Sequence, residues 1–142
     1  SLYDTAVEAQ GKVFVTTELR GGGTSTPQTM ALADRGVRNF LKFAGIIEGE
    51  PELADEPPLQ LDMPDASCYV QSVHRGILEL ALSLGDRVRR GDLVARVHAF
   101  ERTGTPAVEY RAERDGMLVA RRFPALVDIG DTLAVIADIV EG

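Results

Sequence analysis

Residues 88–97 (VRRGDLVARV) and residues 127–136 (VDIGDTLAVI) repeat one pattern at a constant offset of 39 positions. In both stretches a Gly-Asp pair precedes an apolar run, as expected for a turn that leads into a strand. Upstream of each copy, Gly76 and Gly116 precede a further apolar run. Two copies of a strand–turn–strand unit predict a small, pseudo-symmetric all-β module over residues 62–142. The matched pairs are Val88 with Val127, Gly91 with Gly130, Asp92 with Asp131, Ala95 with Ala134, and Val97 with Ile136.

This pattern resembles the barrel-sandwich hybrid of biotinyl and lipoyl carrier domains, which hold their cofactor on a lysine at a hairpin tip. The chain has two lysines, Lys12 and Lys42, and both lie outside the β module. The ten basic residues of the module are all arginines, which cannot form the acyl-lysine amide. A swinging-arm carrier is therefore excluded, and we expect the barrel-sandwich-like module to have a structural or capping role.

An acidic, proline-rich segment, EGEPELADEPPLQL at residues 48–61, precedes the β module. It holds five acidic residues, three prolines and no base, and it supplies −5 of the net charge of −7. Such a composition is typical of a solvated linker, and an acidic recognition peptide is the alternative. The sequence thus predicts three parts, which are residues 1–47, the linker and residues 62–142.

The N-terminal part, residues 1–47, has the pattern of a helix, a strand and a second helix. Gly11 is a stop signal for the first helix. Residues 13–17 (VFVTT) have the β-branched and aromatic character of a strand buried on both faces. Thr26-Pro27 is the expected start of a helix that runs to Gly45. One strand cannot form a sheet, so we expect this part to be the terminal strand and helix of a larger α/β domain. Partner strands from another chain are the alternative, and the whole chain is expected to be α+β.

The overall composition limits the class of protein. The chain has 142 residues, of which 44% are hydrophobic, so it can bury a core. A net charge of −7 argues against a broad electrostatic surface for nucleic acid or an anionic membrane. One cysteine, Cys68, rules out an internal disulfide framework and is typical of a reducing compartment. No apolar run reaches membrane-spanning length and no signal segment is recognisable, so we expect a cytoplasmic protein.

Few side chains in the sequence suggest chemistry. His74 and His98 are the only histidines, and neither has a second ligand at the spacing of a zinc site, so both are expected to be structural. Cys68 has no cation or histidine beside it and is expected to be a small buried residue. The loop RGGGTSTP (residues 20–27) lacks the ending of a P-loop and the spacing of a dinucleotide fingerprint. Glu18 remains, at the end of the predicted strand and beside this loop, as either a catalytic group or a polar residue where the strand ends.

The stretch VFVTTELRGGGTSTPQTMALADRGVRNFLKFAGII (residues 13–47), with the linker and the double Gly-Asp module, resembles the C-terminal portion of the succinylglutamate desuccinylase/aspartoacylase family. This family is related to zinc carboxypeptidases. The resemblance covers essentially the whole chain and is most specific at TTEL-x-GGG. It implies that Glu18 is the general base that takes a proton from zinc-activated water and delivers it to the departing amine.

The same resemblance implies where the metal ligands are. They are a His-x-x-Glu pair and a later histidine that precede this segment, so no metal ligand is expected in this chain. Arg20 stands where the family usually has a glycine. Its side chain could face a substrate carboxylate or point into solvent.

Two hypotheses follow. In the first, the chain is the C-terminal part of a zinc-dependent N-acyl amino-acid deacylase, inactive without the upstream part of its catalytic domain. In the second, it is a non-catalytic binding or assembly module in which the β-rich part is functional. The single predicted strand would leave apolar surface uncovered, which favours association, so a homo-oligomer is a further expectation.

Overall fold

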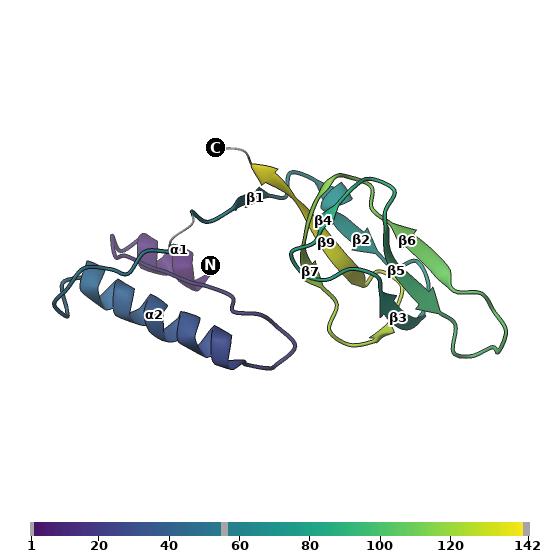
Figure 1. The fold of residues 1–142 in the computed structure, drawn as a ribbon, viewed down its shortest axis with the longest axis horizontal. Helices are drawn as coiled ribbons and strands as arrows, with labels where there is room; N and C mark the ends of the chain where they lie inside the picture. The colour runs from purple at the N-terminus through teal and green to yellow at the C-terminus, as the bar shows by residue number, and fades with distance from the viewer. Residues whose placement is uncertain (1, 55–56, 141–142) are drawn as a thin grey trace. The chain divides into compact units, whose positions relative to one another are not determined.

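The computed structural model describes residues 2–54 and 57–140. Its internal contacts divide the chain into two compact units, Ser1–Asp55 and Glu56–Gly142. The first unit is helical and the second is built of strands (Figure 1). Across the described residues, no helix is both long and apolar enough to cross a membrane. The expectation of an α+β chain is confirmed, and each unit is considered on its own.

The helical unit contains two α-helices, α1 (Tyr3–Glu8) and α2 (Pro27–Phe43). The turn after α1 closes at Gly11, which has a positive φ of 66° and donates its backbone N–H to the Glu8 carbonyl. A capping box starts α2. The Thr26 hydroxyl accepts from the Thr29 backbone N–H at 3.2 Å, and the Thr29 hydroxyl accepts from the Thr26 N–H at 2.9 Å. Both helix boundaries therefore follow from local sequence signals.

The strand predicted at residues 13–17 is not formed, and that prediction was wrong for this structure. Residues 12–20 run without regular secondary structure between α1 and the loop before α2 (Figure 1). A strand requires a neighbour that pairs with its backbone N–H and C=O groups, and the described residues of this unit offer none. The segment still contacts α1, because the rings of Tyr3 and Phe14 lie 5.6 Å apart in a T-shaped arrangement. Val13 and Val15 are 63% and 66% exposed, so the expected burial on both faces is also absent.

The apolar face of α2 is only partly covered. Phe40 and Leu41 are half-buried, whereas Met30 and Val37 are each 60% exposed. Caps and periodicity are sufficient to form the helix, but much of its apolar surface has no cover within the helical unit. Exposed apolar surface of this kind is consistent with the hypothesis of a larger α/β domain.

The acidic segment 48–61 is shared between the two units. Asn39 of α2 accepts the backbone N–H of Glu52 and donates its amide N–H to the Glu52 carbonyl, both at 2.8 Å. Lys42 donates to the Glu50 carbonyl at 3.0 Å. At the other end, Gln60–Asp62 form strand β1 of the second unit. Both ends of the expected linker are therefore held by hydrogen bonds to a folded unit.

The described part of the second unit contains one 3₁₀ turn, η1 (Ala66–Cys68), and nine strands in two antiparallel sheets. One sheet has the order β1-β9-β7-β4, with β2 also paired to β9, and the other has the order β6-β5-β3-β8. Besides β1, the strands are β2 (Tyr69–Gln71), β3 (Gly76–Leu80), β4 (Arg87–Val88), β5 (Leu93–His98), β6 (Val108–Arg111), β7 (Gly116–Arg121), β8 (Leu126–Val127) and β9 (Thr132–Val140).

The sequence repeat is visible in the structure as an exchange of short strands. β3 pairs with β5 within the first copy, and β7 pairs with β9 within the second. The short strand of each copy instead joins the other copy, β4 beside β7 and β8 beside β3. Val88 lies opposite Gly116, and Val127 lies opposite Gly76. The two copies are thus interlocked.

The two Gly-Asp pairs of the repeat form the same turn. Gly91 and Gly130 have positive φ values of 93° and 89°, which a residue with a Cβ rarely adopts. The carboxylates of Asp92 and Asp131 each accept the backbone N–H three residues earlier at 2.8 Å. The aspartate therefore closes the turn that the glycine makes possible.

Two equivalent glycines let strands approach closely. A Cβ at Gly76 would lie 2.4 Å from the His98 carbonyl oxygen, and a Cβ at Gly116 would lie 2.3 Å from that of Ala137. Both distances are shorter than real Cβ contacts. The glycines that precede each apolar run in the sequence are thus required by close packing.

The core of the second unit lies between its two sheets. Leu118 and Ile136 come from one sheet and Val94 and Val97 from the other; all four are at most 2% exposed and belong to one cluster. Burying each such side chain contributes about 1.5–3 kcal/mol. The strand pairings of the described residues leave both sheets open, so the all-β character of this part is observed but the expected barrel-sandwich arrangement is not confirmed.

Candidate functional site

Glu18 lies near the end of the irregular segment 12–20, just before the glycine loop. Its side chain is exposed. Beyond it, Gly22 and Gly23 adopt positive φ values of 70° and 65°. A Cβ added at Gly21 or Gly23 would meet no atom within 4 Å. The carboxylate therefore lies beside a loop with open space around its backbone, where a ligand can approach.

The glycine loop is tied to the start of α2. The Thr24 hydroxyl donates to the Gly21 carbonyl at 3.4 Å, and the capping box between Thr26 and Thr29 fixes the first turn of the helix. Thr29 is only 7% exposed. The loop is thus anchored at its C-terminal end, and Glu18 lies before its other end.

Arg20, the second site residue suggested by the sequence, lies directly before the three glycines of the loop. It is exposed and has a φ of 69°. Neither Arg20 nor Glu18 takes part in an ion pair within residues 2–54 and 57–140. The structure therefore brings the two charges into one short segment without pairing them.

The two histidines have structural partners in the β unit. His74 Nδ1 lies 2.8 Å from the hydroxyl of the buried Tyr110, which also accepts the Val73 backbone N–H at 3.1 Å. His98 Nε2 lies 2.6 Å from a carboxylate oxygen of Glu79. Among the described residues, no three His, Cys, Asp or Glu side chains lie close enough to hold a metal ion.

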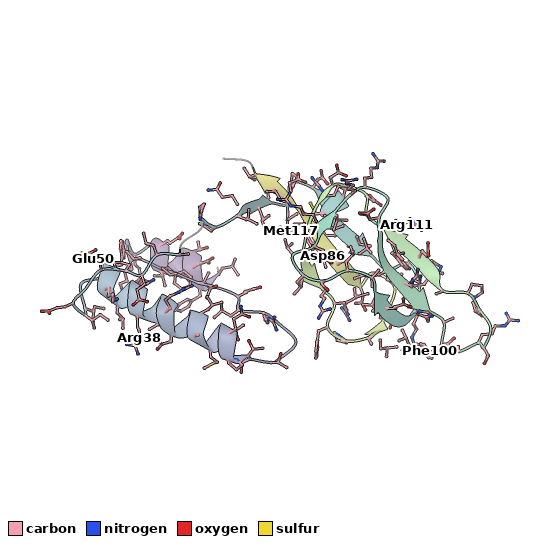
Figure 2. All side chains as sticks on the ribbon, viewed as in Figure 1. Arg38, Glu50, Asp86, Phe100, Arg111 and Met117 are labelled. Atoms are coloured by element: carbon pink, nitrogen blue, oxygen red, sulfur yellow. The ribbon has the colours of Figure 1, made fainter. Side chains whose placement is uncertain are left out.

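His98 is one end of a charged network across β5, β3 and β6. Glu79 binds His98 and also accepts from Arg96 at 2.9 Å, and Arg96 in turn donates to Glu109 at 3.3 Å. Arg111, which Figure 2 labels beside β6, completes the series by donating to Glu109. The hydrogen bond to His98, and then that to Arg96, lowers the pKa of Glu79 below its ordinary value. These groups are at least partly exposed and pair with one another, as in a network of surface ion pairs, each of which contributes little to stability.

No family model matches the chain. Over 141 residues, or 99% of its length, the chain is 62% identical to the N-alpha-acetyl-L-2,4-diaminobutyric acid deacetylase of Halomonas elongata. Among solved structures, it matches the product-bound ectoine utilization protein EutE (DoeB) from Ruegeria pomeroyi with a TM-score of 0.89 and 49% identity over 96% of the chain. It matches a succinylglutamate desuccinylase from Silicibacter with a TM-score of 0.88 and 50% identity over 98% of the chain. The succinylglutamate desuccinylase/aspartoacylase of Rhodobacter sphaeroides follows, with a TM-score of 0.87 and 30% identity over 96% of the chain.

The chain corresponds to the C-terminal portion of the succinylglutamate desuccinylase/aspartoacylase family. It spans 41% of the Halomonas deacetylase and 41%, 42% and 43% of the three solved chains. The similarity includes the helical unit with Glu18 as well as the β unit, because nearly the whole chain is matched in each comparison.

One cluster of polar side chains in the β unit was not predicted from the sequence. Cys68 is fully buried, and Arg114 Nη1 lies 3.0 Å from its Sγ. Arg114 also donates through Nε at 3.0 Å and through Nη2 to the two carboxylate oxygens of Asp138. The hydrogen bond to Asp138 is the main cause that raises the pKa of Arg114 above its already high value. Because 46 residues separate Arg114 from Cys68, only the arrangement of the sheet, and no local motif, brings the cation to the thiol.

Proposed function

We propose that the intact protein containing this chain is a zinc-dependent, carboxypeptidase-like N-acyl amino-acid deacylase that hydrolyses an amide bond. The observation that carries this proposal is the 62% identity to an N-alpha-acetyl-L-2,4-diaminobutyric acid deacetylase over 99% of the chain. We take an N-acetyl amino acid of this kind as the substrate. The exposed carboxylate of Glu18 beside the open glycine loop supports the same assignment.

In this proposal Glu18 is the general base. Its carboxylate takes a proton from a water molecule while the water oxygen forms a bond to the amide carbonyl carbon. The carbon–nitrogen bond then breaks, and Glu18 returns the proton to the departing amine. The products are a carboxylic acid and a free amino acid, so the protons balance over the cycle.

The described residues do not fit a zinc site by themselves, because they include no suitable cluster of ligands. Zinc bound by ligands elsewhere in the intact protein would polarise the carbonyl and activate the water. For this reason we expect the 142-residue chain alone to lack activity. We further propose a cytoplasmic protein that functions as a homo-oligomer, with the uncovered face of α2 packed against the rest of its catalytic domain. The β unit then serves as a capping module.

The test is Glu18→Gln in the intact protein, assayed by acetate release from N-alpha-acetyl-L-2,4-diaminobutyric acid. Glutamine keeps the shape but cannot accept the proton, so kcat should fall by about 10²- to 10⁴-fold. Glu8→Gln is the matched control, since Glu8 is an exposed acid on α1 and its loss should leave kcat unchanged. Wild-type turnover in the Glu18 variant would refute the role of this carboxylate and favour a non-catalytic module.

A further inference from the structure

Arg20 has an unusual backbone conformation. Its φ of 69° makes it the one residue other than glycine with a positive φ in the described parts of the chain. The left-handed region brings the Cβ of an L-residue too close to a neighbouring carbonyl oxygen, which glycine avoids. Three glycines follow at residues 21–23, and the two of them with positive φ, Gly22 and Gly23, adopt this conformation without that clash. A positive φ at a residue with a Cβ is the kind of backbone outlier from which a role of the side chain can be inferred.

The guanidinium of Arg20 is available for a ligand. The residue is exposed, and its charge is not consumed by an ion pair with any carboxylate of residues 2–54 and 57–140. Leu19, between Glu18 and Arg20, is half-buried. In this segment the side chains of Glu18 and Arg20 are therefore exposed to solvent, whereas the apolar side chain of Leu19 between them is partly covered.

The proposed function determines what this cation would meet. An N-acyl amino acid carries its carboxylate only three bonds from the carbonyl carbon that the water attacks. A cation two residues from the base is therefore near the carboxylate end of a substrate whose amide faces Glu18. A guanidinium matches a carboxylate with two parallel hydrogen bonds, and it repels the free amine of a diamino acid.

We propose that Arg20 binds the α-carboxylate of the N-acyl amino-acid substrate and thereby selects acids over neutral amides. This inference rests on the proposed deacylase activity. It assigns to Arg20 a role in substrate recognition, distinct from the proton transfer by Glu18. The strained φ of Arg20 is then the conformation that directs its side chain to the substrate.

The experiment uses the intact protein with two substrates, an N-acetyl amino acid and its carboxamide analogue, and three Arg20 variants. Arg20→Gly removes the charge and relieves the backbone strain, whereas Arg20→Met removes the charge and keeps the strain. Both should raise KM for the acid by about 10- to 100-fold with little change in kcat, as expected for the loss of hydrogen bonds to a charged group. Arg20→Lys keeps the charge but loses the planar fork and should recover part of the affinity.

Discrimination between the two substrates is the decisive readout. The wild type should prefer the acid over the carboxamide by a similar factor in KM, and Arg20→Gly should lose that preference. The Tm of Arg20→Gly should be unchanged or higher, so a rise in KM cannot be assigned to unfolding. Arg35→Ala, which removes an exposed cation from α2, should behave as the wild type.

The failures of the two proposals can be told apart. If Glu18→Gln is inactive but Arg20→Gly retains the preference for the acid, the role of Arg20 is refuted and the deacylase assignment stands. If the wild type hydrolyses neither substrate, both proposals are overturned.

Discussion

Gly76 and Gly116 provide a quantitative test of the interlocked repeat. The perturbation is Gly→Ala at each position, which adds one methyl group. At Gly116 this methyl would lie 2.3 Å from the Ala137 carbonyl oxygen and 2.9 Å from Ile136 Cγ2. At Gly76 it would lie 2.4 Å from the His98 carbonyl oxygen and 2.6 Å from Val97 Cγ1. Contacts below 3.0 Å essentially never occur for real Cβ atoms, so the backbone of the neighbouring strand must move.

The expected loss in the free energy of unfolding depends on the kind of atom that the added methyl group contacts. A flexible side chain could rotate away, but both carbonyl oxygens belong to the backbone of paired strands. Overpacking of a core typically costs about 1–3 kcal/mol, and a shift of paired backbone belongs at the upper end of that range. For a unit of this size, about 2–3 kcal/mol lowers the Tm by roughly 8–24 °C. The cost of the close contact should be similar at both sites, and Gly116→Ala should lower the Tm somewhat further because Gly116 also has a positive φ of 158°.

Thermal unfolding followed by far-ultraviolet circular dichroism measures the effect. Gly104→Ala is the matched control in the same unit, because a Cβ there would meet nothing within 4 Å although φ is 80°. Its cost should be about 1–2 kcal/mol, from the backbone conformation alone. If Gly76→Ala and Gly116→Ala were no more destabilising than this control, the close approach of the strands would be refuted. A large effect at one site only would contradict their equivalence.

Two further changes test the polar groups of the β unit. Tyr110→Phe removes the hydroxyl that accepts the Val73 N–H and contacts His74, so the free energy of unfolding measured in urea should fall by about 1–3 kcal/mol. The control is Tyr69→Phe, because Tyr69 is exposed, and it should lower the free energy of unfolding by less than about 0.5 kcal/mol. Equal losses in the two variants would contradict a role for the buried network. The pKa of Glu79 is lower in the folded state than its ordinary value of 4.5, chiefly through the hydrogen bond to His98. Its stabilisation is therefore present above pH 4.5 and is lost as the pH falls through the folded pKa. The Tm of Glu79→Gln should accordingly lie below that of the wild type near neutral pH and converge with it once the pH has fallen below the folded pKa of Glu79; a difference in Tm that stays constant as the pH is lowered would refute the linkage.

The features that were predictable from the sequence are those that depend on a few neighbouring residues. The start of α2 follows from the hydroxyl of Thr26 and the fixed φ of Pro27. The two Gly-Asp turns follow in the same way, because glycine supplies the positive φ and aspartate accepts a nearby N–H. The candidate Glu18 was recognisable because a carboxylate, a glycine loop and a helix start follow one another along the chain.

What could not be predicted depends on which partner a segment meets. Residues 13–17 have the composition of a strand, but composition does not supply a neighbouring strand, and the segment is irregular without one. The Gly-Asp turn signals indicate where β4 and β8 end, yet they do not show that each strand joins the other copy. The contact between Cys68 and Arg114 likewise depends on strands that are distant in sequence.

The position of β9 in the chain has a consequence for folding. It is the last strand of the described residues, and β1, β2 and β7 all pair with it. The five-stranded sheet therefore cannot assemble on the ribosome until β9 has emerged, and β3 likewise waits for β8. Such non-local pairing makes folding slow and leaves strand edges open to other chains in the meantime. Neither copy of the repeat can mature before the other, so translation that stops before Thr132 yields an unfolded module instead of half of a folded one.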